Sequence, residues 1–431
     1  MKRPQPMTND AKPRLTPKLR FPEFRDQPGW DETILGSVLT EHGEKNDGSS
    51  EVHSVSVHKG VINQIEHLGR SFAAADRSNY NLAKPHDIIY TKSPTGDFPW
   101  GVVKQNRLPY NVIVSPLYGV FSPVNRHLGY ILDAYFESPI RTTNYLAPIT
   151  QKGAKNTIQI SNATFLSKGL YLPSSDAEHK KIADCLCSLD ELIGAEGRQL
   201  DALKAHKKGL MQQLFPREGE TCPRLRLPEF RGKPEWEKAN LGQVADFESG
   251  GTPSKQNPAF WDGSTPWASA KDMKMLFLDD TEDHITTAAV DAGAKVVPAG
   301  TVLMLTRGMT LFNDVPICVP LRPMSFNQDV KALRAKGGLK SGFLPYLLLG
   351  NRQRLLSMVD AAGHGTGRLN TDELRSLIVM HPQAAEQQRI VECLSALESI
   401  ISAQSNEVAA LKTHKKGLMQ QLFPSPTEAE A

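Results

Sequence analysis

Polar side chains that could contact nucleic acid gather in loops of both halves of the sequence. Residues 248–255 read Glu-Ser-Gly-Gly-Thr-Pro-Ser-Lys, and hydroxyl and ammonium groups beside open glycine backbone can donate to phosphate oxygens. Arg307, Asn327 and Gln328 are candidates for contacts to base edges, because arginine suits guanine and asparagine or glutamine suits adenine. Each such residue alone could equally be an ordinary solvated loop residue. We predict DNA binding through Ser54, Lys59, Lys92, Lys104, Asn106, Arg107, Thr252, Ser254, Lys255, Lys271, Arg307, Asn327 and Gln328.

The sequence lacks the common motifs of catalysis. It contains no Gly-x-x-x-x-Gly-Lys-Ser/Thr phosphate loop, no His-Glu-x-x-His, no Cys-x-x-Cys pair and no Gly-x-Ser-x-Gly elbow. Residues 257–260, Asn-Pro-Ala-Phe, resemble the Asn-Pro-Pro-Phe/Tyr motif of DNA amino-methyltransferases. The second proline is missing, however, and no glycine-rich turn for a methyl donor precedes the motif. We therefore expect no catalytic residue, no metal site and no cofactor.

An internal repeat organises the chain. Residues 19–25 recur with one difference as residues 225–231, at an offset of 206. Residues 206–216, His-Lys-Lys-Gly-Leu-Met-Gln-Gln-Leu-Phe-Pro, recur unchanged as residues 414–424, at an offset of 208. Identity over this length indicates duplication rather than chance. The chain therefore consists of a linker, a variable block and a helix, each present twice.

Both copies of the repeated segment carry apolar residues at alternating spacings of four and three. In the first copy these are Ile182, Leu186, Leu189, Ile193, Leu200, Leu203, Leu210 and Leu214, with Glu196 and Lys207 filling the remaining positions. This heptad pattern predicts two long helices that end before Pro216 and Pro424 and pair as an antiparallel coiled coil. Because their exposed positions are also repeated, we predict one partner-binding surface used twice: His206, Lys207, Lys208, Gln212, His414, Lys415, Lys416 and Gln420.

The two variable blocks, residues 31–172 and 237–380, share little sequence but both predict mixed α/β structure. Short strands are expected at 87–90, 101–103, 110–114, 301–305 and 316–319, and helices at 128–137 and 343–357. The predicted fold is therefore two domains of similar mixed α/β (α+β) fold joined by two long antiparallel coiled-coil helices, with a pseudo-twofold internal repeat. The expected segments are a tail (1–18), a first domain (19–176), a helical spacer (177–216), a linker (217–236), a second domain (237–384), a second spacer (385–424) and a tail (425–431).

Charge and cysteine content constrain the class of protein only weakly. The 50 basic and 47 acidic side chains leave a net charge of +3, so charge totals do not argue for DNA binding. The five cysteines fit neither zinc spacing nor a redox pair, and reduced thiols are expected. No apolar stretch approaches a membrane span, and the N-terminus does not resemble a secretory signal. We expect a cytoplasmic protein with no membrane partner.

Several motifs in a fixed order carry a family resemblance. They are the Leu-Arg-Phe/Leu-Pro-Glu-Phe-Arg openings before Trp30 and Trp236, the Gly-Thr-Pro-Ser of residues 251–254 with the later Pro266-Trp267, the Ala385-Glu386-Gln387 entry into the second helix, and the duplicated helix end. Together they resemble the specificity subunits of Type I restriction–modification systems from about residue 19 to 424. The first block departs from the pattern, since it has His179 in place of glutamine and lacks the Gly-Thr-Pro entry.

The resemblance implies a non-catalytic subunit that reads double-stranded DNA for a multisubunit restriction endonuclease and adenine methyltransferase. Each variable domain would read one half of a split site, and the helices would set the gap between the halves. The helices would also dock two methyltransferase subunits, and restriction/translocase subunits would join them. Two alternatives stay open from the sequence: a single-chain methyltransferase or nuclease, and a scaffold of two adaptor domains that binds no DNA.

Overall fold

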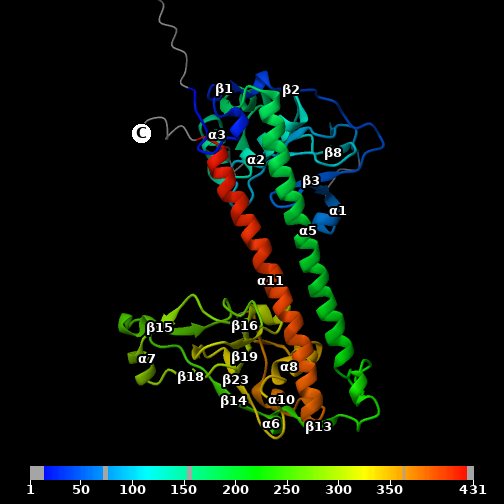
Figure 1. The fold of residues 1–431 in the computed structure, drawn as a ribbon, viewed down its shortest axis with the longest axis vertical. Coiled ribbons are helices and arrows are strands. Elements are labelled where there is room, and N and C mark those ends of the chain that lie inside the picture. The colour runs from blue at the N-terminus through cyan, green and yellow to red at the C-terminus, as the bar shows by residue number, and fades with distance from the viewer. Residues whose placement is uncertain (1–13, 71–75, 153–157, 363–364, 425–431) are drawn as a thin grey trace, which may run out of the picture. The chain divides into compact units, whose positions relative to one another are not determined.

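The computed structural model describes residues 14–70, 76–152, 158–362 and 365–424. The first predicted tail lies outside the described residues up to residue 13, and the second lies wholly outside them. The chain forms two compact units, which are described separately below. Unit 1 comprises residues 1–197 and 407–431, and unit 2 comprises residues 198–406. Both units are mixed α/β (Figure 1).

Unit 1 is built around a four-stranded antiparallel sheet in the order β2-β9-β6-β7. Helix α2 covers this sheet, because its Ile131 and Phe136 lie in one core with Tyr90 and Phe121. The elements are η1 (Pro22–Phe24), β1 (Asp31–Ile34), η2 (Leu35–Ser37), β2 (Leu39–Glu41), β3 (His53–Ser56), β4 (Gly60–Asn63), α1 (Gln64–Leu68), β5 (Asn81–Ala83), β6 (Ile88–Tyr90), β7 (Val103–Gln105), β8 (Val112–Val114), β9 (Gly119–Pro123), α2 (Arg126–Phe136), α3 (Pro139–Leu146), η3 (Ala147–Ile149), β10 (Gln151–Lys152), β11 (Ile158–Gln159), α4 (Asn162–Leu166), β12 (Gly169–Leu172) and the start of α5.

Unit 2 repeats this arrangement in the sheet β14-β23-β19-β21-β16. The first four strands pair antiparallel in the same order as in unit 1, and β16 adds a parallel strand at the edge. The elements are η5 (Pro228–Phe230), β13 (Glu237–Asn240), α6 (Leu241–Val244), β14 (Ala245–Ser249), η6 (Pro258–Phe260), β15 (Trp261–Ala268), β16 (Phe277–Leu278), β17 (His284–Ile285), α7 (Thr287–Asp291), β18 (Val296–Val297), β19 (Val302–Leu305), β20 (Arg307–Gly308), η7 (Met309–Phe312), β21 (Ile317–Pro320), β22 (Met324–Phe326), β23 (Val330–Ala335), α8 (Leu344–Gly350), α9 (Arg352–Ser357), β24 (Asp360–Ala362), β25 (Thr366–Arg368), α10 (Thr371–Ser376), β26 (Ile378–His381) and the start of α11.

Four of the strands expected from sequence are present as β6, β8, β19 and β21, and the helix expected at 128–137 is α2; the strand expected at 101–103 shares only Val103 with β7. The single helix expected at 343–357 is wrong, because Asn351 divides it into α8 and α9. The backbone of Asn351 leaves helical geometry at φ −96° and ψ 12°. Its side-chain amide donates to Leu347 O at 2.9 Å, which ends the first helix.

Two long helices, α5 (Asp176–Leu214) and α11 (Ala384–Leu422), have 39 residues each. In unit 2 their segments run antiparallel, because Gln199 Nε2 donates to Gln404 Oε1 at 3.4 Å and Lys207 pairs with Glu398. In unit 1 Lys415 Nζ lies 2.6 Å from Asp190 Oδ1. The repeat offset of 208 relates the two ion pairs, so the same contact forms once in each unit.

A buried ion pair fixes each linker to the start of a long helix. In unit 1, Arg20 donates to both carboxylate oxygens of Glu178 at 2.8 Å, and Trp30 Nε1 donates to the same carboxylate at 3.2 Å. We call these residues the anchor triplet. Unit 2 repeats it with Arg226, Glu386 and Trp236 at 2.9, 2.7 and 3.2 Å.

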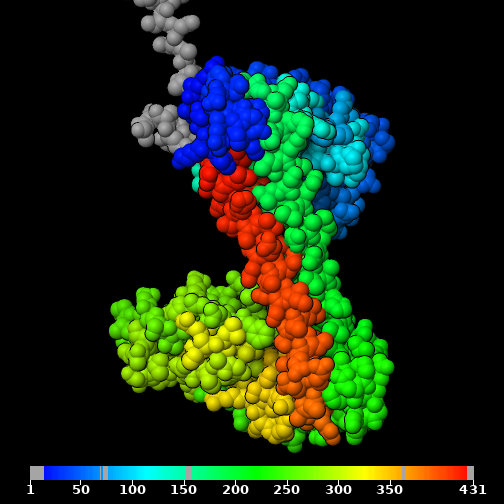
Figure 2. Space-filling model, in the orientation of Figure 1, coloured from blue at the N-terminus to red at the C-terminus, as the bar shows by residue number. Residues whose placement is uncertain are grey.

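The end of the other long helix closes over each triplet. In unit 1 the ring of Phe423, just beyond α11, meets Trp30 edge-on at 6.4 Å, and Leu19 N donates to Gln421 O at 3.1 Å. Figure 2 shows this red helix end against the blue N-terminal segment. In unit 2 Phe215, just beyond α5, meets Trp236 edge-on at 6.0 Å. Within the described residues, no helix combines the length and apolar character needed to cross a membrane.

Candidate nucleic-acid interface

The glycine-rich loop of the second variable block lies against the turn after β22. Gly251 N donates to Phe326 O at 3.0 Å. A Cβ at Gly250 would lie 2.3 Å from Phe326 O, so this close approach requires glycine. The loop therefore brings Thr252 to Gln328, and Thr252 Oγ1 donates to Gln328 Oε1.

Gln328 is exposed at the tip of this turn with its amide already oriented. Besides the bond from Thr252, its Nε2 donates to Asp329 Oδ2 at 3.4 Å. An amide has two acceptor positions and two donor hydrogens, so one of each remains for a further partner. This is the pair with which glutamine contacts an adenine edge. Asn327 instead shapes the turn, since it is 9% exposed and its Oδ1 accepts from Asp329 N at 3.1 Å.

Other residues predicted in unit 2 lie near the same tip, with one exception. Arg307 is exposed in β20, and its backbone N donates to Asp329 O at 3.2 Å. Ser254 and Lys255 are exposed in the loop that carries Thr252. Lys271 differs, because its ammonium pairs with Asp283 at 3.0 Å and with Glu282 at 3.1 Å, and these partners raise its pKa. Its charge is therefore already neutralised within the block.

In unit 1, a shallow hollow lies where loops after β2 and β6 meet. Lys92 follows β6 as Arg307 follows β19, and it lines the hollow with Lys45, Asn81 and Asn162. Burial lowers the pKa of Lys92, although the charge of Glu41 opposes this effect. Two further predicted residues lie on the β3–β4 hairpin: half-buried Ser54 and exposed Lys59.

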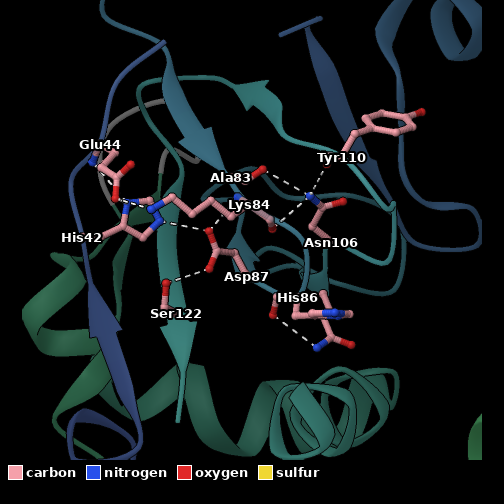
Figure 3. Close-up of polar contacts among 10 residues, drawn as sticks. His42, Glu44, Ala83, Lys84, His86, Asp87, Asn106, Tyr110 and Ser122 are labelled. Carbon is pink, nitrogen blue, oxygen red and sulfur yellow. Dashed lines mark hydrogen bonds and ion pairs between the residues drawn. The ribbon is translucent and has the colours of Figure 1, made fainter. Parts of the chain in front are cut away.

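Asp87 organises the loops around this hollow, and the sequence reasoning missed it. Figure 3 shows its carboxylate accepting from Lys84 N at 2.7 Å, from Ser122 Oγ at 2.7 Å and from His42 Nε2 at 3.0 Å. The other ring nitrogen of His42 accepts from Glu44 N at 3.1 Å, so Nε2 carries the hydrogen. Asp87 is only 2% exposed and serves the scaffold rather than the surface.

Asn106 has an internal role rather than the predicted one. It is fully buried, and its Nδ2 donates to Ala83 O at 3.2 Å and to Lys84 O at 3.0 Å (Figure 3). Its Oδ1 accepts from Leu108 N at 3.2 Å. These contacts hold the segment after β7 against the segment after β5, and no face of the side chain is open to DNA.

Lys104 turns inward, and Arg107, although exposed, is engaged by carboxylates of its own unit. Lys104 is 8% exposed and its ammonium lies 3.2 Å from Asp133. Arg107 pairs with Asp133 at 2.7 Å and with Asp190 at 3.0 Å, and its guanidinium lies 4.1 Å from the ring centroid of Tyr130. We therefore remove Lys104, Asn106 and Arg107 from the DNA-contacting set.

The predicted partner surface on the helices divides into outward and inward residues. Lys415 is 8% exposed and pairs with Glu137 and Asp190, and Lys207 pairs with Glu398. Both lysines therefore face the interior of their units rather than a partner. The exposed residues are His206, Lys208 and Gln212 in α5 and His414, Lys416 and Gln420 in α11.

The described residues contain no group of three or more His, Cys, Asp or Glu side chains that could hold a metal ion. The cysteines are free thiols, of which Cys318 is buried and Cys393 is exposed. The arrangement thus offers two polar tips for binding on repeated scaffolds.

Comparisons with known proteins agree with this geometry. Residues 233–412 match the family model of the Type I restriction modification DNA specificity domain. The chain is 30% identical over 248 residues to the EcoR124I/EcoR124II specificity subunit of Escherichia coli. This alignment covers 57% of this chain and 58% of that protein. It is 25% identical over 174 residues to the MjaIX specificity subunit of Methanocaldococcus jannaschii, covering 39% of each. These alignments span less than two thirds of either relative.

Solved structures are similar over a longer stretch. The S subunit of a Type I restriction–modification system from M. genitalium gives a TM-score of 0.60 at 15% identity, covering 95% of this chain and 100% of that one. A chain from a structure of a type I R-M system gives a TM-score of 0.50 at 18% identity, covering 92% and 98%. At these identities the likeness concerns the fold.

Proposed function

We propose that this chain is the non-catalytic subunit that reads DNA for a restriction–modification complex, because residues 233–412 match the family model of the Type I restriction modification DNA specificity domain. The recognition domain in each unit reads one half of a bipartite site. The two long helices form an antiparallel coiled-coil spacer that sets the unread gap between the halves.

The observation that carries this proposal is that the same scaffold occurs twice but presents different polar loops, which we call the tips of the two units. The strand order of the main sheet and the anchor triplet recur in both units. The tips do not recur, since unit 2 presents Gln328 with Thr252 and unit 1 presents a hollow around Lys92. A repeated frame with unlike tips suits a protein that reads two different short sequences.

Contacts to phosphates and to bases divide between different residues in this proposal. Hydroxyl and ammonium groups near the tips contact the backbone and fix the register. Gln328 reads an adenine, because its free donor and acceptor match the N6 and N7 positions. The backbone-contacting residues are Ser54, Lys59, Lys92, Thr252, Ser254 and Lys255.

The repeated outer faces of the helices account for the partners. His206, Lys208 and Gln212 recur as His414, Lys416 and Gln420, and all six are exposed. A face that occurs twice suits one kind of partner bound twice, and we assign it to two methyltransferase subunits. The restriction/translocase subunits join through that core.

A genome methylation map tests the function directly. Long-read sequencing of the native host with and without this gene is expected to show loss of one split motif, with two short half-sites around a fixed gap. Replacement of residues 237–384 by the matching domain of a relative is expected to change one half-site only. Persistence of every methylated motif after deletion contradicts the proposal.

A further inference from the structure

Three cations near the tip of unit 2 lack a carboxylate partner among the described residues. Most of their basic neighbours are paired: Arg334 and Lys295 with Glu248, Arg375 with Asp372, and Lys336 with Asp246. Arg307 and Arg368 form no ion pair in the described part of the chain, and Lys331 donates only to the neutral hydroxyl of Ser249. We call Arg307, Arg368 and Lys331 the cation triad.

Two members of the triad lie directly opposite each other. Arg307 in β20 and Arg368 in β25 are antiparallel partners, and both side chains are exposed. Residues at such positions share one face of the sheet with Cβ atoms about 5 Å apart, and like charges there repel. Asp360 lies opposite Arg368 on its other side, without an ion pair to it. An anion between the two guanidiniums would relieve the repulsion.

Lys331 adds a third charge, since it lies opposite Met304 in the β19–β23 ladder, three residues before Arg307. It is half-buried in β23, and burial lowers its pKa, as do the positive charges of Arg375, Lys295 and Arg368. An ammonium group has three donors, so at least one remains beyond the bond to Ser249. Bound phosphate would supply the negative charge that this half-buried lysine lacks.

The triad is next to the turn that carries Gln328. Arg307 N donates to Asp329 O at 3.2 Å, and Leu369 N, directly after Arg368, donates to Thr306 O at 2.9 Å. The two arginines are thus fixed through their backbones to the element that presents the amide. A phosphate held there would lie beside the base that the amide contacts.

We propose that Arg307, Arg368 and Lys331 form a binding site for a DNA backbone phosphate on the second recognition domain. This rests on the proposed function and changes the expected role of Arg307 from base reading to backbone binding. A guanine edge is satisfied by one bidentate arginine, whereas two facing guanidiniums suit an anion that accepts from several directions.

The test is the salt dependence of DNA binding by the full chain assembled with its methyltransferase subunits. Duplexes with and without the mapped motif are titrated between about 50 and about 200 mM salt. For the R307A/R368A double variant, loss of this one phosphate contact is expected to reduce the magnitude of the slope of log K against log salt by about 1. Affinity should then fall for both duplexes by the same factor, and the methylated motif should not change.

Two matched variants separate this site from general charge effects and from misfolding. R307K/R368K keeps the charges and should keep most of the slope. R322A removes a half-buried arginine that lies before β22, at the end of that strand away from the turn, and pairs with Asp280 at 3.5 Å; it should leave the slope within about 0.5 of the parent value.

The possible outcomes distinguish the two proposals. If the parent complex binds its motif and the double variant keeps the parent slope, the phosphate site is overturned and the proposed function stands. If the double variant loses affinity for the motif duplex alone, the arginines read bases and the phosphate site is also overturned. If the parent complex does not discriminate between the duplexes, both proposals are overturned.

Discussion

The two units bind their long helices through one identical set of contacts and one that differs. The anchor triplet is the same in both, because its residues belong to the duplicated linkers and helix starts. The second set centres on Asp190 in unit 1 and Glu398 in unit 2. Asp190 accepts from Lys415, Tyr130 and Arg107, whereas Glu398 pairs with Lys207.

The difference arises in the variable blocks. Tyr130 in α2 donates to Asp190, while Tyr346 at the matching place in α8 is buried and its hydroxyl has no hydrogen-bond partner among the described residues. Contacts from the variable block thus determine how strongly that block is attached to a helix whose sequence is repeated. Each variable block can change its loops while the triplet keeps the block attached to the helix, and the second set of contacts adjusts the strength of the attachment.

The largest expected effect comes from breaking an anchor triplet. Glu178→Ala leaves the buried guanidinium of Arg20 uncompensated and Trp30 Nε1 without an acceptor, so unit 1 should lose about 3–5 kcal/mol of unfolding free energy. Glu386→Ala should cost unit 2 a similar amount. Hydrogen exchange in urea, read separately on peptides of each unit, measures both losses.

Glu23→Ala is the matched control for the triplet. Glu23 pairs with Lys181 at 2.8 Å, but both side chains are about half exposed, at 48% and 49%. Such a surface pair should contribute under about 1 kcal/mol. If Glu178→Ala costs no more than this control, the triplet is not what holds the domain.

The second expected effect separates the two units. Asp190→Ala removes the shared partner of Lys415, Tyr130 and Arg107 and should cost about 3 kcal/mol in unit 1. Glu398→Ala removes one ion pair, to Lys207, and should cost about 1 kcal/mol in unit 2. The same exchange measurement compares them, and equal losses would show that Tyr130 and Arg107 add nothing.

Acid should weaken unit 1 through the same cluster. Burial alone would raise the pKa of Asp190 and of Asp133, but their cationic and hydroxyl partners outweigh it and hold both values below the usual range. A carboxylate with a depressed pKa contributes stability that is complete above its unfolded pKa of about 3.9 and is lost as pH falls through the folded value.

The measurement is the free energy of unfolding of unit 1, read from hydrogen exchange of its peptides at about pH 6 and then stepwise down to about pH 3. Over this interval the parent chain should lose at most about 1 kcal/mol for each of the two carboxylates, because only the part below their unfolded pKa of about 3.9 contributes. Asp190→Asn should show a smaller loss over the same interval. A parallel loss in the parent and the variant would mean that Asp190 titrates normally.

The repeat predicted much of this architecture. The heptad pattern also indicated that Lys207 and Lys415 lie inside, although both were predicted to bind a partner. Lys207 fills a seam position of the four-three spacing, and Lys415 is its duplicate. Reading the repeated His-Lys-Lys as one outer surface overlooked this, although a helix turns by about 100° per residue, so adjacent residues face different sides. The structure follows the spacing, and both lysines lie inside.

The errors at the tips have a different cause. A loop arginine looks alike in sequence whether it faces solvent or a carboxylate far along the chain. The partners of Arg107 are 26 and 83 residues away, so only the fold reveals them. The same holds for Asn106, whose three acceptor carbonyls come from two segments. By contrast, Gly250 marked a true close approach, because a Cβ there would lie 2.3 Å from Phe326 O.

The smallest expected effect tests the residue that follows the glutamate of each triplet. His179 Nε2 donates to Pro173 O at 2.7 Å, as Gln387 Nε2 donates to Pro382 O at 2.8 Å. Gln387 has a second task, because its Oε1 accepts from Lys340 N at 2.8 Å. Among the described residues no backbone N–H donates to the ring of His179, whose Nδ1 instead lies 3.3 Å from Asp176 Oδ1.

Substituting each of these residues by the other should therefore affect the stability of the two units unequally. His179→Gln keeps the donor to Pro173 and should change the stability of unit 1 by less than about 0.5 kcal/mol. Gln387→His leaves Lys340 N without its acceptor and should cost unit 2 about 1 kcal/mol. Denaturant midpoints of each unit measure both. Equal costs would mean that the bond to Lys340 contributes nothing to stability. Histidine and glutamine would then be interchangeable in both copies, and the departure of the first copy from the family pattern would have no structural consequence.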